Sequence, residues 1–74
     1  MPVMDREMLT AQLKDADESL AARQEQIELQ RKVVATMEAR GEDTAAVKET
    51  LQRLELAQSL YRQHRDRLAE ALKK

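Results

Sequence analysis

MEARGEDT, residues 37–44, holds the only glycine of this 74-residue chain. Glycine enters the left-handed backbone conformation without steric cost, so Gly41 predicts the end of a helix. Asp43 or Thr44 then offers a side-chain oxygen to the free N–H groups that begin a second helix. The segment therefore predicts a turn at residues 41–43 that reverses the chain.

The sequence on both sides of this turn favours helix. It is 42% hydrophobic and 36% charged, with one aromatic residue and no cysteine. Unbranched charged residues, alanine and leucine dominate, and these are good helix formers. The first helix is expected over about residues 3–40, starting either near Pro2 or after Asp5 as N-cap, and the second over about residues 44–72. One glycine and one proline supply too few turns for a multi-stranded fold, so we predict the all-α class.

Apolar residues recur along both halves at alternating steps of three and four, the spacing of coiled-coil core positions. We call these positions the seam; they are Leu13, Ala16, Leu20, Arg23, Ile27, Gln30, Val34, Met37, Val47, Leu51, Leu54, Gln58, Tyr61, Arg65, Leu68 and Leu72. Folding at the turn pairs these positions at one consistent register, which places Arg23 opposite Tyr61. The sequence predicts one domain, an antiparallel two-helix hairpin that is coiled-coil-like.

Two features indicate that another chain covers part of this hairpin. Arg23, Gln30, Gln58 and Arg65 occupy seam positions, where they either bury badly without partners or extend to solvent. Apolar residues also fall off the seam or beyond the end of the second helix. The candidate self-association or partner interface is Met4, Met8, Leu9, Ala22, Leu29, Val33, Leu56 and Leu60. We predict a homodimer that forms a four-helix bundle, although scattered exposed leucines are also ordinary surface.

No arrangement of residues in the sequence points to catalysis. His64 is the single histidine, and with no cysteine it has no companion for a metal site. Ser19 and Ser59 are expected to lie mid-helix without a base in reach, and one glycine cannot build a phosphate-binding loop. We therefore expect no catalytic residue, cofactor, metal or small-molecule substrate, and a protein that is not an enzyme.

A basic cluster near the C-terminus is the only candidate for anion or nucleic-acid contact. Its members are Arg62, Arg65, Arg67 and Lys74. Asp66 and Glu70 reduce its local charge, and the formal net charge of -1 gives no field that attracts nucleic acid. The expected architecture is nevertheless similar to that of the Rop-like plasmid copy-number regulators, which makes a small RNA- or DNA-binding regulator the alternative function.

Several residues around the turn carry a second resemblance. They are Ile27, Gln30, Arg31, Val34, Glu38, Gly41, Asp43, Thr44, Leu51, Gln58, Arg65, Asp66, Arg67 and Leu68. Over about residues 24–72 the chain resembles a group of short bacterial proteins of unknown function that are predicted helical hairpins. The resemblance implies a bacterial, cytoplasmic, helical protein and no particular activity.

The leading expectation is thus a non-enzymatic structural or protein-interaction module. Its expected partner is a second copy of itself, and another protein is the further partner class. Neither a membrane-spanning stretch of roughly 20 apolar residues nor a secretory signal is recognisable, so we expect a cytoplasmic protein and no membrane association.

Overall fold

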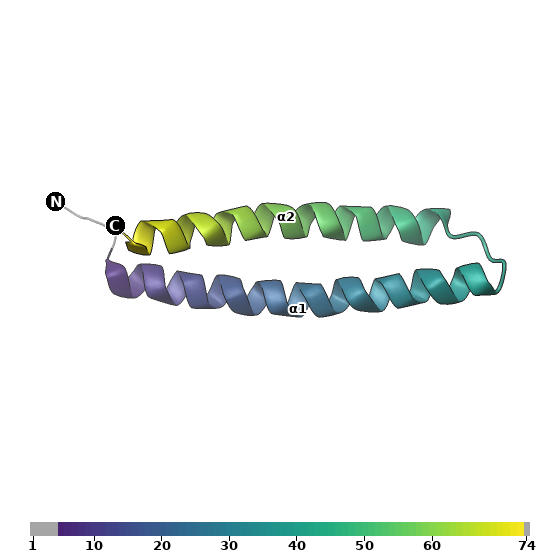
Figure 1. Cartoon of the computed structure of the whole chain (residues 1–74), viewed down its shortest axis with the longest axis horizontal. Helices are drawn as coiled ribbons and strands as arrows, with labels where there is room; N and C mark the ends of the chain where they lie inside the picture. Colours follow the sequence, from purple (N-terminus) through teal and green to yellow (C-terminus); the bar gives the residue numbers. More distant parts are fainter. Residues whose placement is uncertain (1–4, 74) are drawn as a thin grey trace.

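A computed structural model describes residues 5–73 and contains two helices. Helix α1 spans Arg6–Ala39 and helix α2 spans Ala45–Lys73. The helices run side by side in opposite directions, and their Cα atoms extend over 60 × 15 × 15 Å (Figure 1). The predicted all-α helical hairpin is confirmed. Within residues 5–73, neither helix is long and apolar enough to cross a membrane.

Helix α1 begins at Arg6, later than the expected position near residue 3. Asp5 has extended backbone angles, φ -63° and ψ 133°, and is therefore the last residue before the helix. Its carboxylate accepts a hydrogen bond of 3.0 Å from the Glu7 N–H, one of the donors that a helix start leaves free. Asp5 is thus the N-cap, which agrees with the second of the two expected helix starts.

Gly41 ends α1 in the left-handed conformation, at φ 72°. The Glu42 N–H donates to the Met37 carbonyl at 2.9 Å, and the Gly41 N–H donates to the Glu38 carbonyl at 3.0 Å. These two bonds form a Schellman motif, which satisfies carbonyl groups that the helix end leaves without partners. Asp43 then accepts from the Ala45 N–H at 3.0 Å. Asp43 rather than Thr44 therefore supplies the side-chain oxygen at the start of α2.

The seam lies between the two helices. Ile27 is 2% exposed and is the most enclosed side chain, and Val34 and Leu68 are also buried. The remaining seam positions are buried or half-buried, apart from Tyr61, which is 45% exposed. Because each helix contributes one strip to this contact, the core is narrow and the other sides of both helices meet solvent.

The position of Leu9 differs from the sequence-based expectation that it belongs to an exposed interface. It was expected to extend past the end of α2 without cover from its own chain, but it is 6% exposed. Leu9 lies four residues before Leu13, so it continues the seam by one position and belongs to the core. Its neighbour Met8 is 55% exposed, as expected. Met4 lies outside the described residues.

The polar seam residues differ in how far they are buried. Gln58 is 4% exposed, and its Nε2 donates to the Leu20 carbonyl at 3.0 Å, while its Oε1 has no hydrogen-bond partner. Arg23, Gln30 and Arg65 are half-buried. Arginine side chains thus reach the edge of the seam, and Gln58 alone is enclosed in it.

Replacement of Gly41 tests the turn. A Cβ atom at Gly41 would meet nothing within 4 Å, so the Gly41→Ala variant introduces only the cost of the left-handed backbone. We expect a loss of about 1 kcal/mol in the free energy of unfolding. Urea denaturation followed by circular dichroism at fixed protein concentration measures this loss. Gly41→Asn is the control and should lose less, because asparagine tolerates this conformation; equal stability of all three proteins would contradict the assignment.

Replacement of Gln58 tests the polar layer of the seam. Gln58→Met keeps an unbranched side chain of similar length and removes the unpartnered Oε1 atom. The Leu20 carbonyl keeps its place in the hydrogen-bond ladder of α1. We expect the free energy of unfolding to rise by about 1 kcal/mol. A fall in the denaturation midpoint would show that the Gln58 hydrogen bond outweighs the burial of its amide.

Candidate interaction surface

The two broad sides of the hairpin differ in chemistry. On one side, ion pairs connect the helices: Arg31 to Glu55 at 2.8 Å, Lys48 to Glu38 at 2.9 Å, and Arg65 to Asp17 at 3.6 Å. Asp17, Arg31 and Glu38 are separated by multiples of seven residues, so they lie along one strip of α1. We call this side the charged face. Since its charges are already paired, burial of this face against another protein would add little to the free energy of association.

The opposite side carries exposed apolar side chains. We call it the apolar face; its residues are Ala22, Leu29 and Val33 on α1 and Ala57, Leu60 and Tyr61 on α2. Leu29 is 60% exposed and Leu60 is 57% exposed. Leu29, Val33 and Thr36 line one shallow groove of about 330 Å³, and Ala57, Leu60 and Tyr61 line another of about 370 Å³. No ion pair of the described residues joins the helices across this face.

A third groove, of about 480 Å³, continues the apolar face toward the open end of the hairpin. Its lining residues are Gln12, Asp15, Ala16, Ser19, Arg23, Tyr61 and His64. The Arg23 guanidinium carbon lies 3.9 Å from the centre of the Tyr61 ring, a cation–π contact across the helices. This contact pairs the two residues that the predicted register placed opposite each other.

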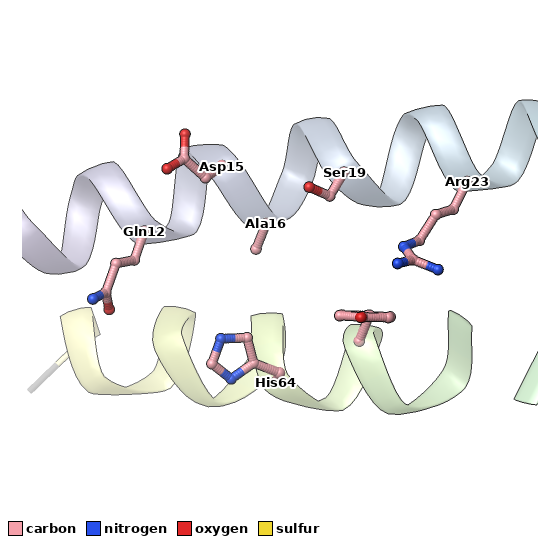
Figure 2. A pocket seen from close by; sticks show the side chains of 7 residues that line it. Gln12, Asp15, Ala16, Ser19, Arg23 and His64 are labelled. Atoms are coloured by element: carbon pink, nitrogen blue, oxygen red, sulfur yellow. The ribbon is translucent and has the colours of Figure 1, made fainter. Parts of the chain in front are cut away.

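The same groove brings Ser19 and His64 onto one surface. The sequence had suggested no base near Ser19, and the antiparallel register is the reason that they share this groove. Figure 2 shows the Asp15 carboxylate directed away from His64, so it does not orient the imidazole as a catalytic carboxylate does. Among the hydrogen bonds of residues 5–73, none joins Ser19 to His64. The three residues are therefore not arranged as a nucleophile with its base.

Four of the eight candidate interface residues share one side of the hairpin. Ala22, Leu29, Val33 and Leu60 share the apolar face, and all four are exposed. Leu56 is 64% exposed and lies one helical turn before Leu60, at the border of that face. Ala57 and Tyr61 belong to the face but were missing from the sequence-based set. Spacing along one helix did not identify them, because their place on this face depends on how the two helices lie against each other.

The candidate basic cluster does not form one exposed patch. Arg65 lies near Asp17 and Asp66, at 3.6 and 3.3 Å, so its charge is balanced locally. Arg62 lines a small hollow of about 160 Å³ on the charged face, together with Glu55. Arg67 lies elsewhere, seven residues after Leu60 on the same strip of α2, and Lys74 is outside the described residues. This arrangement does not present the continuous positive surface that nucleic acid binding uses.

Residues 5–73 contain no group of three or more histidine, cysteine or carboxylate side chains placed to hold an ion.

No family model, characterised protein or solved structure matches this chain.

A double-mutant cycle tests the Arg23–Tyr61 contact. Arg23→Met and Tyr61→Leu remove the charge and the ring while keeping apolar bulk. We expect a coupling free energy of roughly 0.5–1 kcal/mol between the two sites, because the contact is partly exposed. Chemical denaturation of the four proteins measures it. Purely additive effects would show that the contact does not stabilise the hairpin.

Proposed function

We propose that this protein is a non-enzymatic interaction module that works as a homodimer, in which two hairpins pack into a four-helix bundle. The observation that carries the proposal is the concentration of exposed large apolar side chains on one side of the hairpin. Leu29, Val33, Leu60 and Tyr61 lie there, while the opposite side is closed by ion pairs. Amphipathic helix pairs of this kind bury their second apolar strip against another helical layer.

The energetics of the single hairpin support a second layer. In the described chain only Leu9, Ile27, Val34 and Leu68 are buried apolar residues. A domain of this size buries about 60% of its unfolded surface, and a small core of this kind supplies only a few kcal/mol. Full burial of an exposed leucine contributes about 1.5–3 kcal/mol relative to exposure. Packing two apolar faces together would therefore add stability that the isolated hairpin lacks.

The available area is sufficient for a stable dimer. A standard interface buries about 800 Å² per partner, roughly one seventh of the 5852 Å² accessible surface of this chain. One long side of the hairpin, whose Cα atoms extend over 60 by 15 Å, is of that order. A second copy is the favoured occupant because two exposed charges of opposite sign, Asp15 and Arg67, continue the strips of this face and can complement each other in a symmetric pair.

The charged faces stay outside in this assembly, where their ion pairs remain in contact with water. Our proposal places the dimer in the bacterial cytoplasm, in keeping with the family resemblance at the turn. The nucleic-acid alternative has less support, because Arg65 is paired with acidic residues and Arg67 lies on a different side of the hairpin from Arg62.

Sedimentation equilibrium between 1 and 100 µM, as a rough range around common homodimer affinities, tests the proposal. We expect the mass of two chains for the natural protein. Leu29→Glu combined with Leu60→Glu should weaken the dimer by at least about 100-fold, since charges replace apolar contacts in both copies.

The matched control adds the same two carboxylates to the other side. Ala21 and Gln52 are exposed and lie one helical turn from Asp17 and Lys48. The Ala21→Glu, Gln52→Glu protein should keep the dimer mass. A natural protein with the mass of one chain at 100 µM would refute the proposal, and so would dissociation of the control to the same extent as the apolar-face variant.

A further inference from the structure

We infer that the two copies pack through their apolar faces with both turns at the same end, so that α1 of one copy lies over α2 of the other. The inference rests on the proposed homodimer and specifies its symmetry. The two-fold axis would then run along the length of the hairpins. The alternative axis, perpendicular to the helices, would place the two turns at opposite ends and lay α1 on α1 and α2 on α2.

The ends of the apolar strips carry complementary charges. Asp15 lies seven residues before Ala22, and Arg67 lies seven residues after Leu60, so each charge continues the strip of its own helix. Both are exposed, and each lies in the half of its helix that is farther from the turn. Neither forms an ion pair within residues 5–73. These two charges are therefore available to a partner.

The same-end arrangement pairs these charges, because α1 of each copy faces α2 of the other at the same height. Asp15 of one copy then meets Arg67 of its partner, and the symmetry makes this contact twice. With the turns at opposite ends, Asp15 faces the other α1 and Arg67 faces the other α2. Each charge would then enter the interface without that partner, which is unfavourable for a desolvated group.

The apolar residues favour the same arrangement. The Arg23–Tyr61 contact shows how α1 and α2 are aligned along the hairpin axis. In this alignment Leu29 and Ala57 lie within about one helical turn of each other along that axis. The same-end axis therefore brings Leu29 of one copy over the small Ala57 of the other, and the apolar face over its equivalent. A perpendicular axis through the middle of the hairpin would instead lay Leu29 near the Gln12–Asp15 end of the groove.

Pulsed electron resonance on spin-labelled full-length chains distinguishes the two symmetries. The sequence has no cysteine, so Glu42→Cys at the turn and Thr10→Cys near the open end each give one label per chain. With helices packed about 8–10 Å apart, the same-end dimer should give label distances below about 35 Å at both sites. Opposite ends would give a distance approaching the 60 Å length of the hairpin between the Glu42 labels and roughly 40 Å between the Thr10 labels.

Charge reversal tests the Asp15–Arg67 contact in the same dimer. Asp15→Arg should weaken dimerisation roughly tenfold, because it places like charges together twice. The doubly reversed protein, Asp15→Arg with Arg67→Asp, should recover most of the affinity of the natural protein. Asp17→Arg with Arg65→Asp is the matched control on the charged face; there the exchange takes place within one chain and should leave the affinity nearly unchanged.

The outcomes separate the inference from the proposed function. Short label distances together with rescue by double reversal support the inference. A stable dimer with long label distances, or one in which double reversal gives no rescue, would overturn the inference and leave the proposed homodimer intact. A protein with the mass of one chain at all concentrations would overturn both.

Discussion

The contact between α1 and α2 is one strip wide on each helix, and the rest of the structure depends on that constraint. Two helices can enclose only the side chains that point directly at each other, so Ile27 is nearly inaccessible while residues one position away meet solvent. A strip this narrow leaves two broad sides uncovered. These two sides differ in chemistry, because ion pairs lie on one side and exposed leucines lie on the other.

Polar groups within that strip reduce its apolar content but add directional contacts. Gln58 bonds a backbone carbonyl of the opposite helix, and Arg23 lies over the Tyr61 ring. Neither contact survives a shift of one helix along the other, whereas leucine layers tolerate several registers. Buried polar positions are known to select register in coiled coils at some loss of stability. In the seam of this protein, Arg23 and Gln58 are the residues whose contacts select one register of the two helices.

The sequence predicted the parts of the fold that depend on periodicity and on one special residue. The spacing of leucines located the seam, and Gly41 located the turn, because only glycine adopts its conformation without strain. Other features depend on side-chain geometry that spacing does not encode. The burial of Leu9, the choice of Asp43 as the capping side chain and the bond from Gln58 to the Leu20 carbonyl are of this kind. The candidate surface was predicted in part: spacing identified Leu29, Val33 and Leu60, while the inclusion of Ala57 and Tyr61 required the positions of both helices.

The single turn also fixes how the hairpin responds to force. The start of α1 and the end of α2 lie at the same end of the molecule, far from the turn (Figure 1). Tension applied through these two positions separates the helices like a zipper, because it loads the layer nearest the open end before any other. Leu9, Leu13 and Leu72 would part first, and the load would then move toward Val34. Separation of one layer at a time requires a lower force than shearing, because in shearing all layers would carry the tension together.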